Sequence, residues 1–207
     1  MIDRSNGYEG VAAEFLAGRG GPRSTRIGAD TVRVWARQLA LGSSVLDLGC
    51  GSGVPITEVL IEEGLAVYGV DASPSLVSAF KQRWPGMPVN CEPVEESSFF
   101  DRQFDAVLAW GLVFLLSARS QRELIGRISV ALRPGGRLLF TAPEQVVSWT
   151  DAMTGRESRS LGAAEYQHEM STVGLRLIDQ YDDDGKNHYY DAVKGPCTVL
   201  ARKLRAG

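Results

Sequence analysis

The chain has 207 residues, of which 44% are hydrophobic and 23% are charged, and its formal net charge is −3. This composition is that of a globular domain with a sizeable core, and it lacks the basic footprint of a nucleic-acid-binding protein. No apolar run approaches the roughly 18 residues of a membrane span, and the start has no signal-peptide pattern, so we expect a cytoplasmic protein without a membrane partner.

The N-terminal segment is predicted to be separate from the domain that follows it. Residues 8–16 carry apolar side chains at helical spacing, and a glycine-rich break follows at 18–22. We therefore divide the chain into an N-terminal segment, residues 1–28, and one domain, residues 29–207.

From residue 29 onward, short apolar runs alternate with stretches of helical periodicity, which is the pattern of a parallel sheet flanked by helices. Strands are predicted at 45–48, 66–70, 89–91, 104–109, 137–141 and 175–181. Helices are predicted at 29–41, 55–63, 74–83 and 119–132, and a further helix ends at Thr172. Ser73 is expected to cap the helix that begins with Pro74.

Two parts of the C-terminal third are less regular. Residues 142–161 show no periodicity and are predicted to form a long loop. The seventh strand is placed at 197–203, with 188–193 as the alternative that periodicity does not exclude.

A glycine-rich turn, residues 49–53, directly follows the first predicted strand. Glycines at this edge of a parallel sheet allow the backbone to approach a ligand closely. The spacing is G-x-G-x-G, which differs from the G-x-G-x-x-G of dinucleotide-binding proteins, and no Walker motif is present. Together with Asp47, this turn favours a cationic ligand without phosphates.

Asp71 ends the second predicted strand, where a carboxylate can accept both hydroxyl groups of a ribose. The alternative is that Asp71 caps the next helix, but Ser73 already fills that role. The ribose interpretation is therefore preferred.

Four segments in register resemble the class I S-adenosylmethionine-dependent methyltransferases: residues 45–53, 68–73, 104–109 and 132–136. The resemblance covers residues 40–142 well and the remainder loosely. It implies an α/β, Rossmann-like fold with a seven-stranded, mostly parallel sheet, helices on both faces and an N-terminal helical lid. It also implies S-adenosylmethionine as the cofactor and S-adenosylhomocysteine as its product.

The resemblance implies roles for the matching positions. Asp47 would hold the methionine ammonium, Asp71 would bind the ribose, Ala72 would pack near the adenine, and Trp110 would lie near the sulfonium. In the lid, Tyr8 matches a tyrosine that touches the cofactor in many relatives. The cofactor-binding residues expected on this basis are Tyr8, Arg19, Asp47, Gly49, Cys50, Gly51, Asp71, Ala72, Ser73, Val94, Glu95 and Trp110.

Two of these expectations leave alternatives open. Pro93 occupies the position where the family often has an acidic residue near the adenine amino group, so Glu92, Glu95 or the backbone around Val94 would make that contact. For the cofactor carboxylate, Arg19 and Arg26 are the candidates, and a solvated surface charge is the equal alternative for both.

Substrate-binding groups are expected in the loops that follow the strands. The predicted substrate residues are Trp149, Arg156 and Arg159, whose arginines would hold an anionic group. The predicted catalytic residues are His188 as a base, with Tyr189 and Tyr190. A surface histidine and core aromatic residues are the ordinary alternatives.

These features predict methyl transfer to a small-molecule acceptor, with an oxygen nucleophile preferred, by a monomer or homodimer. We expect no added recognition domain, and the motif of amino-methylating nucleic-acid enzymes is missing from these residues. The three cysteines are widely spaced and only two histidines are present, so no metal site is expected. The alternatives are a non-catalytic S-adenosylmethionine-binding regulatory or partner protein, and a protein or RNA methyltransferase that acts with a partner.

Overall fold

A computed structural model describes residues 3–19 and 27–196 of the chain. The main strands are β1 (Ser44–Leu48), β2 (Ala66–Asp71), β3 (Val89–Cys91), β4 (Phe104–Ala109), β5 (Leu132–Thr141), β8 (Leu175–Asp182) and β9 (His188–Lys194). The helices are α1 (Ala12–Arg19), α2 (Ala29–Ala36), α3 (Ile56–Glu62), α4 (Pro74–Arg83), α5 (Ala118–Ala131) and α6 (Ala163–Thr172). Shorter elements are the 3-10 helices η1 (Tyr8–Val11), η2 (Phe99–Asp101) and η3 (Val113–Leu115) and the strands β6 (Val146–Thr150) and β7 (Glu157–Leu161).

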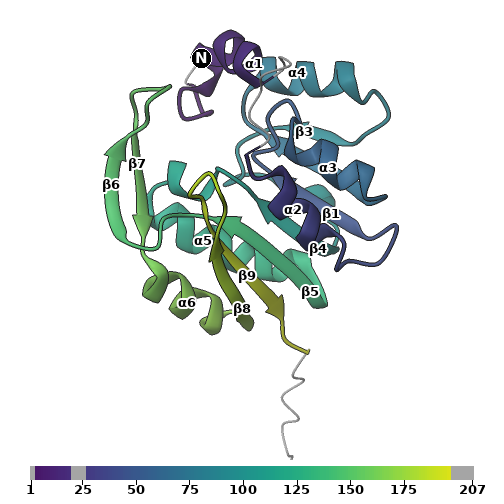
Figure 1. Cartoon of the computed structure of the whole chain (residues 1–207), viewed down its shortest axis with the longest axis vertical. Helices are drawn as coiled ribbons and strands as arrows, with labels where there is room; N and C mark the ends of the chain where they lie inside the picture. Colours follow the sequence, from purple (N-terminus) through teal and green to yellow (C-terminus); the bar gives the residue numbers. More distant parts are fainter. Residues whose placement is uncertain (1–2, 20–26, 197–207) are drawn as a thin grey trace, which may run out of the picture.

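The seven main strands form one sheet in the order β3-β2-β1-β4-β5-β9-β8 (Figure 1). The first five strands pair in parallel, and β9 runs antiparallel to both of its neighbours. The predicted seven-stranded, mostly parallel, Rossmann-like sheet is confirmed. Because β1 and β4 lie side by side while the chain passes through β2 and β3 between them, strand order reverses next to β1, where such sheets bind ligands.

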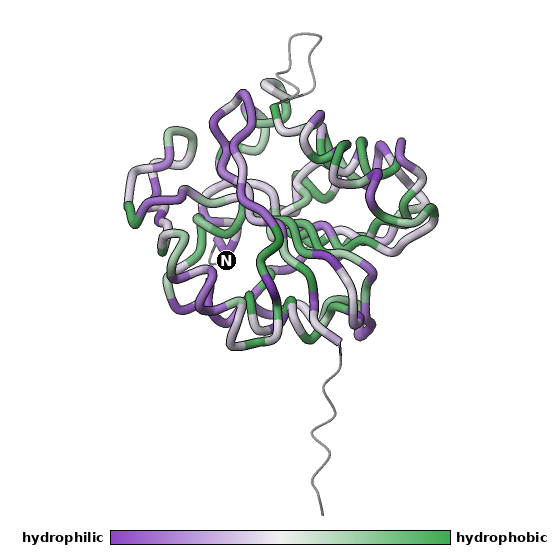
Figure 2. Tube along the Cα trace, turned by 60° about the horizontal axis from the view of Figure 1, so that its bottom comes forward, coloured by the Kyte–Doolittle hydropathy of each residue, from purple (hydrophilic) through white to green (hydrophobic). Residues whose placement is uncertain are grey.

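The core lies on both faces of the sheet, because successive residues of a strand point to opposite sides. In β1, Val45 packs in the cluster that contains α2 and α3, whereas Leu46 packs in the cluster that contains α5 and α6. Hydrophobic residues accordingly concentrate along the central strands (Figure 2). The same alternation directs Asp47 toward α3.

We expect Leu46→Ala to lower the free energy of unfolding by about 2–5 kcal/mol, because Leu46 is fully buried and the substitution leaves a cavity. Denaturant unfolding with an unchanged m-value would measure this loss. Val34→Ala is the control, since Val34 on α2 is 64% exposed and should change stability by less than about 0.5 kcal/mol. Equal losses in the two variants would contradict this description of the core.

The prediction of a long loop at residues 142–161 is wrong. Strands β6 and β7 form an antiparallel hairpin that stands apart from the main sheet. Its inner face pairs Trp149 with Ser158 and Val147 with Ser160, and both serines are buried. Serines at inward positions removed the apolar alternation by which a half-buried strand is recognised.

The seventh strand is β9, which matches the alternative at 188–193. The preferred segment, 197–203, lies outside the described residues. Pairing from Arg137↔Val193 to Thr141↔Tyr189 fixes the register, and the Arg137 guanidinium forms an ion pair with buried Asp191 at 2.5 Å. Strand β5 begins at Leu132, earlier than predicted, because Leu132 pairs with Phe104 before a register irregularity.

Candidate active site

Two adjoining cavities lie at the carboxyl ends of β1, β2 and β4. The first has a volume of about 90 Å³, and the predicted residues on its wall are Tyr8, Asp47, Gly49, Cys50, Gly51 and Trp110. The second has a volume of about 70 Å³, and the predicted residues on its wall are Tyr8, Gly49, Asp71, Ala72, Val94 and Glu95. Both cavities are lined by Tyr8, Gly49, Leu112 and Leu115, so they are two parts of one site.

The glycine turn forms the shared floor of this site. Gly49 and Gly51 have positive φ values of 71° and 56°, and the backbone N–H of Gly49 donates to the Val70 carbonyl at 2.8 Å. A Cβ atom at Gly49 would lie 3.1 Å from the Leu112 Cβ atom. Glycine is therefore needed here both for its backbone conformation and for the close approach of the next loop.

Asp47 supplies a buried carboxyl group to the first cavity. The residue is 2% exposed, and its Oδ2 accepts a hydrogen bond from the Thr57 hydroxyl on α3 at 2.5 Å. Burial raises the pKa of Asp47 to about 7, although the Thr57 hydrogen bond acts in the opposite direction. A cation that enters this cavity would favour the ionised form of the carboxyl group.

Asp71 supplies the second carboxyl group and is held rigidly at the end of β2. Its two oxygens accept the backbone N–H groups of Gly51 and Ser73, each at 2.8 Å. Burial raises the pKa of Asp71, and these N–H groups oppose the shift. The Ser73 hydroxyl caps α4 by accepting from the Leu76 N–H, as expected, so Asp71 does not have to act as the cap.

The loop after β3 forms the far wall of the second cavity. Pro93, Val94 and Glu95 line it, whereas Glu92 accepts a hydrogen bond from the Asn90 side chain at 3.1 Å. Of the alternatives for an adenine contact, Val94 and Glu95 are thus the ones on the cavity wall.

Residues 3–19 of the N-terminal segment lie between α4 and the β6–β7 hairpin (Figure 1), and Tyr8 and Phe15 line the first cavity. On one side, Glu9 accepts hydrogen bonds from the side chains of Ser73 and Ser75 and from the Ser75 N–H. On the other side, Asp3 forms an ion pair with Arg156 at 2.8 Å. The side chain of Arg19, and all of Arg26, lie outside the described residues.

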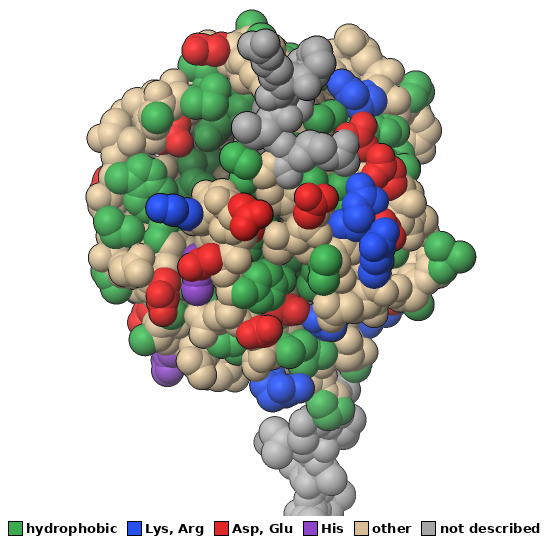
Figure 3. Space-filling view, in the orientation of Figure 1, with side chains coloured by type: hydrophobic (Ala, Val, Ile, Leu, Met, Phe, Trp, Pro, Cys, Tyr) green, Lys and Arg blue, Asp and Glu red, His purple; other side chains and the backbone are tan. Residues whose placement is uncertain are grey.

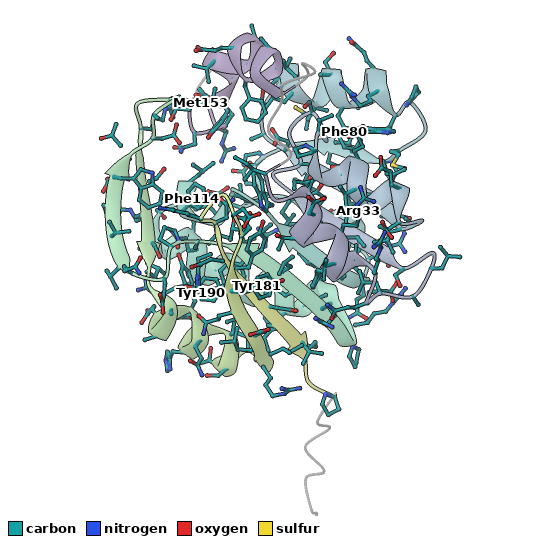
Figure 4. The ribbon with its side chains drawn as sticks, in the orientation of Figure 1. Arg33, Phe80, Phe114, Met153, Tyr181 and Tyr190 are labelled. Atoms are coloured by element: carbon teal, nitrogen blue, oxygen red, sulfur yellow. The ribbon has the colours of Figure 1, made fainter. Side chains whose placement is uncertain are left out.

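The predicted substrate residues are only partly brought together. Trp149 lies on the inner face of the hairpin and packs on Phe114, with ring centroids 5.4 Å apart. Phe114 is labelled in Figure 4. Arg156 forms an ion pair with Asp3. Arg159 lies on the outer face of the hairpin, opposite Ser148 in the strand register, and forms an ion pair with Glu157. The two arginines therefore do not converge on Trp149.

The predicted catalytic residues occupy opposite faces of β9. Tyr190 is fully buried, stacks on Phe140 with centroids 4.6 Å apart and has its hydroxyl near the Pro143 carbonyl, so it belongs to the core rather than to a substrate site. Tyr189 is also fully buried, and its hydroxyl accepts from the indole N–H of Trp110 at 2.9 Å. Neither tyrosine side chain lines either cavity.

His188 does not line either cavity. Its Nδ1 lies 2.7 Å from Asp182, and its Nε2 lies 3.4 Å from Gln180. Both ring nitrogens thus face groups of the β8–β9 hairpin, which gives His188 a structural setting.

Leu112 lies in the loop 110–114, where substrate-binding groups were expected, whereas the wall residues Phe15 and Leu115 were not predicted from the sequence. Leu112 and Leu115 follow β4 directly, and position after a parallel strand was the available signal. Among the described residues, no cluster of three or more His, Cys, Asp or Glu side chains is placed to hold a metal ion. Likewise, none of the described helices has the length and apolarity needed to cross a membrane.

A parallel sheet with a glycine turn after β1, a fixed carboxylate after β2 and cavities at that edge defines a Rossmann-like domain that binds a nucleoside-type cofactor. Consistent with this, a family profile described as a methyltransferase domain matches residues 45–136. This segment, which is less than half of the chain, is therefore similar to a methyltransferase domain.

The chain is also similar to individual methyltransferases. The ubiquinone biosynthesis O-methyltransferase of Coxiella burnetii is 31% identical over 156 residues, which are 67% of this chain and 65% of the relative. The tRNA U34 carboxymethyltransferase of Hahella chejuensis is 36% identical over 104 residues, which are 48% of this chain and 32% of the relative. The chain thus spans less than two thirds of the length of these curated relatives.

Among solved structures, the magnesium protoporphyrin IX methyltransferase of Synechocystis PCC 6803 with bound S-adenosylmethionine superimposes with a TM-score of 0.73. The alignment covers 94% of this chain and 98% of that structure, at 15% identity. At this identity, the similarity shows the shared fold.

Proposed function

We propose that this chain binds S-adenosylmethionine across the two cavities and transfers its methyl group to a small-molecule acceptor, with an oxygen nucleophile preferred. The observation that carries the proposal is the placement of Asp47 and Asp71 in two cavities that share Gly49 as a wall. A buried carboxyl group suits the methionine ammonium, and a carboxylate anchored by two N–H groups suits a ribose diol. The 31% identity to an O-methyltransferase favours an oxygen acceptor.

The bound cofactor would supply a methyl carbon that is already activated for displacement. The protein would then have to orient the acceptor and exclude water. Leu112 and Leu115 line both cavities, and Trp110 lines the first, so these side chains would surround the reacting end with apolar surface. In this arrangement the protein contributes alignment and desolvation, and His188 lies outside the walls of the two cavities.

The acceptor would enter beside the hairpin, where hydrophobic side chains gather on the surface (Figure 3). Val147 and Met153 of this segment are 39% and 41% exposed, and Trp149 on the inner face of the hairpin packs on Phe114. These side chains suit an acceptor with an apolar or aromatic part. If the acceptor is also anionic, it has to compete with Asp3 for Arg156.

Two measurements test the proposal. Calorimetry with S-adenosylmethionine should show binding, and its absence at millimolar concentration would exclude the cofactor site. Release of S-adenosylhomocysteine should then be measured with phenolic, carboxylic and amine acceptors, and with bulk tRNA as a separate arm. Faster turnover with hydroxyl acceptors supports the proposal, whereas binding without turnover in every arm would indicate a non-catalytic protein.

We expect Glu9→Ala to weaken S-adenosylmethionine binding by about tenfold, because Glu9 fastens the N-terminal segment to α4 through Ser73 and Ser75. Hydrogen bonds from these groups also lower the pKa of Glu9, so the carboxylate stays ionised at neutral pH. Glu14→Ala is the control, since Glu14 is exposed on the adjoining helix α1. Calorimetry that gives the same Kd for both variants would show that the fastening does not contribute to binding.

A further inference from the structure

The indole of Trp110 forms part of the first cavity wall and is held on more than one side. Trp110 is the residue that follows β4, and a Cβ atom added to Gly28, just before α2, would lie 2.6 Å from its Nε1. The next residue, Gly111, donates its backbone N–H to the Thr141 hydroxyl at 2.8 Å. Backbone and side chain are therefore both restrained at this point of the wall.

A hydrogen-bond chain leads from this indole into the β8–β9 hairpin. Trp110 Nε1 donates to the Tyr189 hydroxyl at 2.9 Å, and that hydroxyl donates to Asp183 Oδ2 at 2.9 Å. An indole can only donate and an ionised carboxylate can only accept, so the direction of both hydrogen bonds is fixed. The Tyr189 hydroxyl thus has a single orientation in which both partners are satisfied.

The far end of this chain is itself anchored. Asp183 accepts hydrogen bonds from the Asn187 backbone N–H at 2.9 Å and from the Asn187 side chain at 2.8 Å. The Tyr189 ring is fully buried and stacks on Tyr181, with centroids 5.3 Å apart and planes inclined by 14°. Burial raises the pKa of Tyr189, so the phenol keeps its proton at ordinary pH.

We propose that Tyr189 and Asp183 are positioning residues, which act through Trp110 to fix the cavity wall beside the methyl donor. This inference rests on the proposed function and extends it to residues that are remote from the cofactor motifs. Because the indole borders the same cavity as Asp47, where the methyl donor would lie, we expect its tilt to set the alignment of the methyl group with the acceptor. The hydrogen-bond chain through Tyr189 and Asp183 should therefore influence the acceptor KM and kcat rather than the affinity of the protein for S-adenosylmethionine.

The test compares Tyr189→Phe, which keeps the stacked ring, with Tyr181→Phe, which removes a hydroxyl from the neighbouring ring outside the chain. The indole N–H resonances of the ¹⁵N-labelled protein are recorded, and that of Trp110 is assigned with Trp110→Phe. We expect the Trp110 resonance to shift in Tyr189→Phe and kcat to fall about tenfold, with the Kd for S-adenosylmethionine within about twofold of wild type. Tyr181→Phe should leave all three quantities unchanged.

Variants of Asp183 test the same hydrogen bonds independently, which is needed if Tyr189→Phe fails to fold. Asp183→Ala should shift the same resonance and lower kcat, whereas Asp183→Asn, which keeps an acceptor oxygen, should restore most of both. An unchanged Trp110 resonance in Tyr189→Phe or Asp183→Ala would overturn the hydrogen-bond chain. A shifted resonance with unchanged kcat and KM would overturn the positioning role. Failure of the wild type to turn over any acceptor would instead contradict the proposed function. The resonance measurements would still show whether the hydrogen bonds from Trp110 through Tyr189 to Asp183 are formed.

Discussion

Replacing Asp71 with alanine is expected to raise the Kd for S-adenosylmethionine by about 100-fold. The carboxylate is held by the N–H groups of Gly51 and Ser73, which aim its remaining acceptor capacity into the second cavity. Hydrogen bonds to a charged group each contribute about 1.5–3 kcal/mol, and a ribose diol would offer two donors. Loss of the carboxylate also removes the hydrogen bond from the Gly51 N–H, which is one of several that join the glycine turn to the end of β2.

Calorimetry with S-adenosylmethionine on three variants, Asp71→Ala, Asp71→Asn and Asp30→Ala, tests the role of the carboxylate. Asp71→Asn keeps the shape and one acceptor oxygen, so its Kd should lie between those of wild type and Asp71→Ala. Asp30→Ala is the control, because Asp30 is exposed on α2, away from both cavities. If Asp71→Ala folds normally and binds within threefold of wild type, Asp71 does not hold the cofactor.

The residues that line the two cavities at the ends of β1 and β2 could largely be predicted from sequence, because their geometry is local and follows from sheet topology. Parallel strands bring their carboxyl ends to one edge, and the pairing Leu48↔Val70 places Asp71 beside the start of the glycine turn. Spacing within residues 45–73 was therefore enough to bring Asp47 and Asp71 to adjoining cavities.

The substrate side could not be predicted in the same way, because it depends on partners that are far apart in the chain. The ion pair of Arg156 with Asp3 joins residues that are 153 positions apart, and no periodic pattern in the sequence predicts such a contact. The buried serines Ser158 and Ser160 concealed a strand. On β9, the sequence placed Tyr189 and Tyr190 together, but alternation across the strand sends them to opposite faces of the sheet.

Cofactor affinity is expected to fall as the pH drops below about 7, by up to tenfold per pH unit, because of Asp47. Burial raises the pKa of this carboxyl group to about 7 in the protein alone. A cationic ammonium selects the ionised form, and ionising the group below its pKa costs about 1.4 kcal/mol per pH unit. Calorimetry across this pH range should show the dependence in wild type and its loss in Asp47→Asn, which should also bind more weakly at pH 8.

The same shift has an opposite consequence for the stability of the protein without cofactor. The pKa of Asp47 is higher in the folded chain than its ordinary value of 3.8, so between about pH 4 and 7 the folded state holds a proton that the unfolded state has released. The contribution of Asp47 to stability is therefore greatest at low pH and declines by up to about 1.4 kcal/mol per unit until pH 7. Asp47→Asn should thus gain stability relative to wild type as the pH rises.

Denaturant unfolding of wild type and Asp47→Asn at pH 5 and pH 8 measures this difference, and comparing the two proteins removes the contribution of other raised groups such as Asp191. An identical stability difference at both pH values would contradict the assigned pKa. With S-adenosylmethionine present, wild type should recover stability mainly at pH 8, because the ammonium compensates the buried charge. The ionised Asp47 carboxylate would thus lower the stability of the protein without cofactor and strengthen its binding of the cofactor.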